Sequence, residues 1–137
     1  MPKRLSRDEY YMGIADLVSR RSTCIRRSVG CIAINKHGHI MSTGYNGTPR
    51  GLPHCIDNPC AGATSKSGEG LSLCQSAHAE INCLLQCPNV MDIDVIYCTT
   101  KPCGECVKAI CNTGCKEVVY RDDYPHEYAV TINMRKI

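Results

Sequence analysis

The sequence contains no phenylalanine and no tryptophan among its 137 residues. Its core must therefore be built from leucine, isoleucine, valine, alanine, tyrosine and cysteine, and a hydrophobic fraction of 43% is enough for a substantial one. No apolar run reaches the length that a membrane-spanning helix needs. Because this length is typical of one folding unit, we expect a single domain over residues 1–137.

A strong charge of either sign is also missing, since the formal net charge is +3. This mild excess suits small anionic molecules and is too weak to indicate a nucleic-acid-binding surface. The first residues lead straight into a polar amphipathic segment, without the apolar region of a signal peptide. We therefore expect a cytoplasmic protein with neither a nucleic acid nor a membrane as partner.

In contrast, the sequence is rich in cysteine, with twelve residues of this type. In a short secreted chain they would indicate a disulfide scaffold, and that alternative stays open. In a cytoplasmic protein the same residues indicate reduced thiols and metal sites, which is the interpretation we adopt.

The first part of the chain predicts a helix followed by a hairpin. Ser6 and Glu9 have the spacing of a capping box, and an apolar periodicity carries the helix to about residue 21. Residues 29–35 and 39–44 are strand-like, and the short connection between them contains Gly38. From residue 45 to 75 the hydrophobic residues show no periodicity, which indicates a long loop. In a compact domain such a loop should either have a function or be held in place by further contacts.

The second part alternates helices and strands. We expect a helix over 77–86, a strand over 95–100, a helix from Pro102 as its first residue to 112, a strand over 117–121 and a short strand around 131–134. This order predicts an α/β fold, with a mixed central sheet of about five strands and helices on both faces. The later strands should run parallel through right-handed crossovers.

The most informative stretch carries one histidine and two cysteines with metal-ligand spacing. His78 begins a His-x-Glu motif that ends at Glu80, and Cys103 and Cys106 form a Pro-Cys-x-x-Cys motif. Three protein ligands leave the fourth position of a catalytic zinc open for water. Residues two apart on a helix point in different directions, so His78 and Glu80 converge only if the motif lies at a helix entrance.

Each motif alone has an ordinary explanation. A single histidine beside a helix is usually a packed or surface residue, and a lone Cys-x-x-Cys is a redox pair or half of a structural zinc site. Together and in this order, the two motifs resemble the signature of the zinc deaminases, in which the glutamate carries protons. We therefore expect Glu80 to be catalytic and His78, Cys103 and Cys106 to bind zinc.

The flanking segments resemble one branch of that superfamily. The matching residues are Ser22-Thr23-Cys24, Val29-Gly30, Ser42-Thr43-Gly44-Tyr45-Asn46-Gly47 and Pro49-Arg50-Gly51-Leu52-Pro53-His54-Cys55, and they are similar to the deoxycytidylate deaminases. The resemblance implies a cytidine-deaminase-like three-layer α/β/α sandwich. It also implies a Zn²⁺-dependent homohexamer that converts dCMP to dUMP and ammonia and so supplies dUMP for dTMP synthesis.

The resemblance further implies activation by dCTP and inhibition by dTTP, with Mg²⁺ accompanying the triphosphate. The short chain is typical of the compact bacterial and bacteriophage forms of these enzymes, so the expected location is the cytoplasm of a bacterium or of a phage-infected host cell. Substrate contacts carried over by resemblance are Asn46, which is expected to hold the deoxyribose hydroxyl near the base, and Ala79. Arg26, with Tyr120 and Arg121, is expected to meet the 5′-phosphate, although Arg27, Arg50 and Lys101 compete for that role.

The stretch Gly44, Tyr45, Asn46 and Gly47 has two interpretations. Asn-Gly favours a positive φ, so the segment can be an ordinary turn after a strand. The flanking match makes it an expected allosteric nucleotide site as well, where backbone amides of a Gly-rich turn form an anion-binding nest.

A second, structural zinc is also expected from the resemblance. Cys24, Cys55, Cys60 and Cys74 are its expected ligands, with His54 as a substitute for one of them. The alternative is that these are merely buried thiols. Most of the other cysteines lie on apolar faces and are expected to be small core residues: Cys31, Cys83, Cys87, Cys98, Cys111 and Cys115.

Two competing functions remain open at this point. One is a zinc deaminase of another base or nucleotide, including a riboflavin-pathway or tRNA-editing type, although the mild charge disfavours tRNA. The other is a non-catalytic zinc-binding module, which would hold each metal with four protein ligands.

Overall fold

The computed structural model describes residues 3–24, 26–54, 56–57 and 76–137. In these ranges the chain forms a five-stranded sheet with the strand order β2-β1-β3-β4-β5. The strands are β1 (Gly30–Asn35), β2 (Ile40–Tyr45), β3 (Ile93–Thr100), β4 (Glu117–Asp122) and β5 (Met134–Lys136). The predicted mixed sheet of about five strands is confirmed.

The strand directions change in the middle of the sheet. β1 pairs antiparallel with both β2 and β3, and β3, β4 and β5 run parallel. Gly38, in the connection between β1 and β2, has a φ of +82°, so a residue without a Cβ closes the predicted hairpin there. The carboxyl ends of the parallel strands lie at one edge, where ligands gather in α/β sheets.

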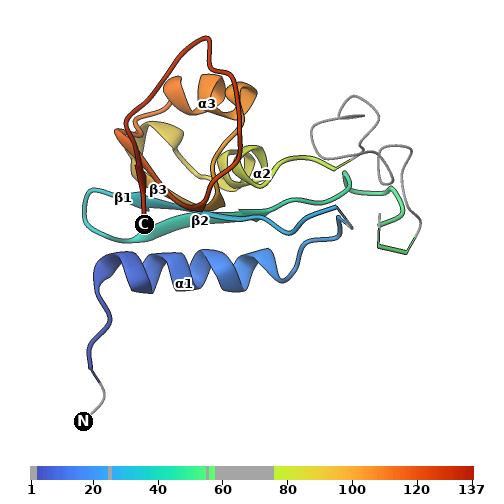
Figure 1. Ribbon diagram of the computed structural model, residues 1–137, viewed down its shortest axis with the longest axis horizontal. Helices are drawn as coiled ribbons and strands as arrows, with labels where there is room; N and C mark the ends of the chain where they lie inside the picture. Colours follow the sequence, from blue (N-terminus) through green and yellow to red (C-terminus); the bar gives the residue numbers. More distant parts are fainter. Residues whose placement is uncertain (1–2, 25, 55, 58–75) are drawn as a thin grey trace.

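Helices cover both faces of the sheet, as predicted (Figure 1). The helix α1 (Arg7–Ser19) lies on one face, and α2 (Ala79–Gln86) and α3 (Gly104–Cys111) lie on the other. Strand β1 shows how the sequence serves two cores, because successive side chains of a strand point to opposite faces. Cys31 and Ala33 pack with α2 and α3, whereas Ile32 and Ile34 pack with α1.

The ends of several elements differ from the prediction. The capping box of Ser6 and Glu9 is present, but α1 ends at Ser19, and the amides of the next two residues bond to carbonyls three residues back. Pro102 is not the first residue of α3, because Cys103 is extended and caps the helix. The last strand is Met134–Lys136 and not 131–134, and a short 3-10 helix, η2 (Val90–Asp92), precedes β3 unpredicted.

The connection from β4 to β5 has no helix. Parallel neighbours usually need a crossover of a dozen or more residues that contains one. Here residues 123–133 join them in an irregular path that arches over α3 (Figure 1). Among the described residues, no helix is long and apolar enough to cross a membrane.

The cysteines that can be placed are mostly core residues. Cys31, Cys83, Cys98 and Cys115 are buried and unpaired, which confirms the prediction for them. Cys87 is only half-buried, and Cys111 is exposed because it ends α3 on the side away from the sheet core.

Candidate metal centre and active site

Three predicted metal ligands come together where two helices begin. His78 caps the N-terminus of α2, Cys103 caps that of α3, and Cys106 lies in the first turn of α3. His78 Nδ1 lies 3.3 Å from Cys106 Sγ and 3.4 Å from Cys103 Sγ. All three donor atoms lie within 4.8 Å of one another, and this is the one such group of three or more found among the described residues.

The spacing of these donors fits a zinc ion. Zinc bonds of about 2.0–2.1 Å to nitrogen and about 2.3 Å to sulfur, at tetrahedral angles, place such donors roughly 3.5 Å apart. One imidazole and two sulfurs are also a typical catalytic donor set. A closed structural site would need a fourth protein ligand, and within the described part of the chain the group has three.

The electrostatics of the ligands favour a cation. The hydrogen bond with Cys106, and to a lesser extent that with His78, lowers the pKa of Cys103 to about 3, which favours its thiolate form. The Cys103 sulfur and burial raise the pKa of the neighbouring Cys106 thiol. The hydrogen bond to Cys103 raises the pKa of His78. A bound divalent cation would replace the protons that these groups now share.

Glu80 lies at the second residue of α2 and is 5% exposed. Its position meets the geometric condition drawn from the sequence, because His78 is still extended while Glu80 is already helical. Both residues line the same pocket. Burial raises the pKa of the Glu80 carboxyl, which makes its carboxylate a better proton acceptor near neutral pH.

The pocket beside these groups combines apolar and cationic walls. Of the substrate contacts predicted by resemblance, Asn46 and Ala79 line it, whereas Arg26, Tyr120 and Arg121 are not among its lining residues. Two of the competing cations, Arg27 and Lys101, do line it. The remaining wall comes from Val29, Thr100 and His126.

Asn46 is buried and holds the segment that carries Arg27. Its Oδ1 accepts from the Val29 amide at 2.9 Å, and its Nδ2 donates to the Arg27 carbonyl at 2.8 Å. Each group keeps one further hydrogen-bonding position, so Asn46 can also meet a ligand. Sequence reasoning found the residue by resemblance and missed this structural role.

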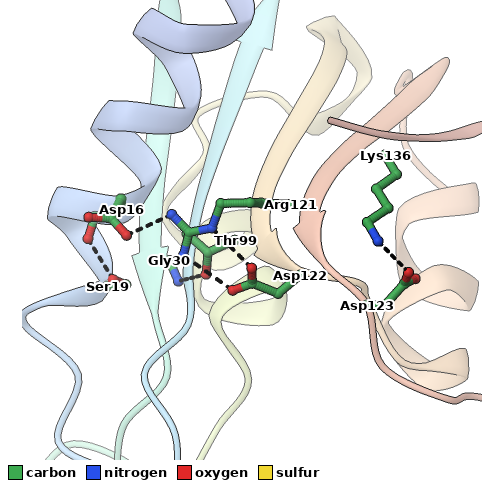
Figure 2. A network of polar contacts seen from close by, with 8 residues as sticks. All are labelled: Asp16, Ser19, Gly30, Thr99, Arg121, Asp122, Asp123 and Lys136. Carbon is green, nitrogen blue, oxygen red and sulfur yellow. Dashed lines mark hydrogen bonds and ion pairs between the residues drawn. The ribbon is translucent and has the colours of Figure 1, made fainter.

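Arg121 is engaged on the α1 side of the sheet (Figure 2). Its Nη1 donates to Asp16 Oδ1 at 2.8 Å and its Nε to Asp122 Oδ1 at 3.1 Å. Tyr120 is buried with its ring 5.4 Å from Lys101 Nζ. Arg121 thus joins α1 to β4, and Tyr120 contacts Lys101. Their expected contact with a phosphate stays a prediction.

The expected anion nest at Gly44–Gly47 needs a correction. The amide of Asn46 donates to the Val29 carbonyl and that of Gly47 to the Ala77 carbonyl. Among the described residues, positive φ angles occur at Gly38 and Gly51 only, so this segment is neither the Asn-Gly turn nor a nest. A role of these residues in nucleotide regulation stays a prediction.

Gly44 has a packing function that the sequence did not reveal. A Cβ there would lie 2.3 Å from the Ala79 carbonyl and 2.4 Å from the Cys83 amide. The missing side chain lets β2 approach α2 closely, next to His78 and Glu80.

Three aromatic residues near the pocket were not predicted. Arg27 Cζ lies over the Tyr124 ring, 4.5 Å from its centroid, and Lys101 Nζ lies 5.6 Å from the centroid of the Tyr128 ring. His126 lies between them, 4.6 Å from Tyr124 and 6.1 Å from Tyr128 by ring centroids. They lie on the helix-free β4–β5 connection, where no periodicity signals a role.

The expected structural zinc lies largely outside the described residues. Cys55, Cys60 and Cys74 fall outside these ranges, Cys24 is buried, and His54 is exposed. The prediction of this site therefore stays untested.

Comparisons with known proteins agree with the site. Residues 5–122 match the family described as the cytidine and deoxycytidylate deaminase zinc-binding region. A deoxycytidylate deaminase of Schizosaccharomyces pombe is 41% identical over 125 residues, which are 88% of this chain and 38% of that protein. The deoxycytidylate deaminase of Mycobacterium phage D29 is 38% identical over 119 residues, with 82% and 92% of the two chains covered.

A solved structure matches nearly the whole chain. The dCMP deaminase of cyanophage S-TIM5, in complex with dCMP and dUMP, superposes with a TM-score of 0.71 at 29% identity, covering 99% of this chain and 100% of that one. The chain spans less than two fifths of the yeast relative but almost all of the mycobacteriophage one. With these matches over a His/Cys/Cys centre beside a buried glutamate, the chain belongs to the cytidine and deoxycytidylate deaminase family.

Proposed function

We propose that this chain, as one deaminase domain, catalyses the hydrolysis of dCMP to dUMP and ammonia. The observation that carries the proposal is the convergence of His78, Cys103 and Cys106 on a pocket that the buried Glu80 also lines. The names of the yeast and mycobacteriophage relatives, and the dCMP and dUMP in the cyanophage structure, support this substrate.

The metal site would hold zinc through His78, Cys103 and Cys106. When bound, zinc would supply Lewis-acid activation of a water molecule, since the group has three ligands within the described part of the chain. The remaining chemistry belongs to the side chains around it.

Glu80 is the proton carrier in this proposal. Its carboxylate accepts a proton from the attacking water as the oxygen bonds to C4 of the pyrimidine, and delivers that proton to N3. It then passes the second proton of the water to the amino group, which leaves C4 as ammonia, so that water and dCMP are converted to dUMP and ammonia. Because its pKa is raised by burial, the carboxyl can both accept and donate near neutral pH.

Arg27 and Lys101 provide the charge for the 5′-phosphate. Both line the pocket, and both are held against tyrosine rings. A guanidinium binds phosphate oxygens in pairs, and an ammonium adds a point charge. This assignment uses the cations that the sequence analysis kept as competitors of Arg26.

The proposal also includes the regulation and the second metal site that the resemblance implies. We infer a homohexamer activated by dCTP with Mg²⁺ and inhibited by dTTP, with Gly44–Gly47 near the effector. A second zinc at Cys24, Cys55, Cys60 and Cys74 would give two zinc ions per chain. Elemental analysis that finds one zinc in fully reconstituted protein would contradict it.

The test is a direct comparison of substrates. Zinc-loaded protein should release ammonia from dCMP faster than from CMP, dCTP or deoxycytidine under the same conditions. Faster release from CMP, dCTP or deoxycytidine than from dCMP would support a deaminase of another substrate, and no release from any of them would contradict the proposal.

A further inference from the structure

Residues 123–133, which we call the strap, are fixed to the loop that carries the metal ligand Cys103. The Tyr128 hydroxyl donates a 2.6 Å hydrogen bond to the carbonyl of Pro102, the residue just before Cys103. At Gly104 a Cβ would lie 2.8 Å from the Glu127 carbonyl, so the strap approaches the start of α3 more closely than a side chain allows. Two separate contacts thus join the strap to the active-site loop.

The strap also contacts both cations of the pocket. Tyr124 lies under Arg27, and Tyr128 shares Lys101 with Tyr120, at 5.6 Å and 5.4 Å from the two ring centroids. An ammonium within about 6 Å of a tyrosine ring is attracted to its face. Tyr120 is buried on β4, whereas Tyr128 comes from the strap, so Lys101 is held from two elements.

We propose that the strap is a substrate-specificity element and that Tyr128 is its positioning residue. The ring of Tyr128 keeps the Lys101 ammonium at the pocket, and its hydroxyl ties the strap to the Pro102 carbonyl. The ligand that this arrangement selects is the phosphate of a nucleoside monophosphate, so the inference rests on the proposed function.

Positioning matters here because lysine is long and flexible. Fixing a free lysine side chain costs rotamer entropy at the moment of binding, and a side chain that is already held loses less. Tyr128 would therefore act on affinity for the phosphate through Lys101, without touching the reacting atoms. If the effect of Tyr128 on affinity depends on the presence of Lys101, then Tyr128 positions that side chain and does not merely stabilise the fold.

The test is a double-mutant cycle on binding of the product dUMP, measured by isothermal titration calorimetry on zinc-loaded protein. Tyr128→Leu should weaken dUMP binding by about 3- to 30-fold. In a Lys101→Met background the same substitution should have little further effect, because its target is gone. Tyr10→Leu is the matched control, since Tyr10 is an exposed tyrosine on α1 and should leave affinity unchanged.

A second variant keeps the test valid if Tyr128→Leu does not fold. Tyr128→Phe removes only the hydroxyl tether and should weaken dUMP binding by about 2- to 10-fold, again only when Lys101 is present. Equal losses in both backgrounds, or no loss from either variant, would overturn the inference. If the unsubstituted protein itself does not bind dUMP, the proposed function fails first.

Discussion

At the scale of single residues, the site depends on where two short motifs meet their helices. The backbone of His78 is extended, and Glu80 lies in the first turn of α2. Likewise, Cys103 caps α3, and Cys106 lies in the first turn of that helix. Unpaired amides and the helix dipole at such positions favour negatively charged side chains. The same local geometry that begins each helix therefore also presents the proposed thiolate ligands and the proposed proton carrier, Glu80.

The first residue-scale prediction concerns the phosphate. Arg27→Ala should raise the KM for dCMP by roughly 10- to 150-fold, because a charge-assisted hydrogen bond to phosphate is lost. Activity on deoxycytidine should change little. Steady-state kinetics on both substrates measure the two effects.

Arg26→Ala is the comparison variant, since the resemblance favoured Arg26 for this role. A larger rise in the KM for dCMP from Arg26→Ala than from Arg27→Ala would return the assignment to Arg26. Equal losses on dCMP and deoxycytidine in either variant would indicate a structural role for that arginine.

At the scale of elements, close contacts between helices and strands position the site. Gly44 on β2 lies against the first turns of α2, where any side chain would meet backbone atoms. Asp16 on α1 reaches Arg121 at the end of β4 (Figure 2). Both contacts join elements that are distant in sequence.

Gly44→Ala should destabilise the protein by about 1–3 kcal/mol or more, because the new methyl group has to displace the backbone of α2. Gly13→Ala is a matched control on α1, where nothing lies within 4 Å of an added Cβ. In this exposed helical position it should instead stabilise by about 0.5–1 kcal/mol. Urea unfolding of both variants measures the difference, and a Gly44→Ala variant as stable as the unsubstituted protein would refute the packing argument.

The Asp16–Arg121 pair predicts a pH dependence of stability. The hydrogen bond from Arg121 lowers the pKa of Asp16 below its usual value near ~4. The stabilisation is therefore present above that value and is lost as the pH falls through the lower, folded-state pKa. Because the two side chains are 34% and 40% exposed, we expect only about 0.5–1 kcal/mol.

Asp16→Asn should accordingly lower the melting temperature at pH 7 by a few degrees, and this difference should shrink as the pH falls below about 4. Thermal unfolding followed by circular dichroism over a pH series measures it. A difference that stays constant with pH would show that the Asp16 charge contributes nothing.

The elements that could be predicted were those with local signals. A capping box marked α1, a short, mostly apolar run before a glycine-containing turn marked β1, and metal-ligand spacing marked the starts of α2 and α3. The strap could not be predicted, because its aromatic residues have no periodicity. Tyr124 and Tyr128 gain their proposed role only through contacts with Arg27 and Lys101. Arg26 was favoured over Arg27 by the resemblance alone, because a sequence does not show which of two neighbouring arginines lines a pocket, and its contact with the phosphate stays a prediction.

At the scale of the whole molecule, the sheet collects the site at one edge. β3 ends at Thr100, next to Lys101 and the Cys103 ligand, while α2 brings His78 and Glu80 to the same pocket. The strap then returns over α3 and closes the outer wall with His126. Residues from α2, from the N-cap of α3, from β3 and from the strap thus line one pocket.

The central claim is that Glu80 moves protons beside a metal held by His78, Cys103 and Cys106 during deamination of dCMP. The most direct measurement is the rate of conversion of dCMP to dUMP by the unsubstituted protein and by Glu80→Gln, at equal measured zinc content. An amide cannot relay the proton, so we predict unchanged zinc content and a rate lower by about 10²–10⁴-fold or more. Near-normal turnover by zinc-loaded Glu80→Gln would contradict the account.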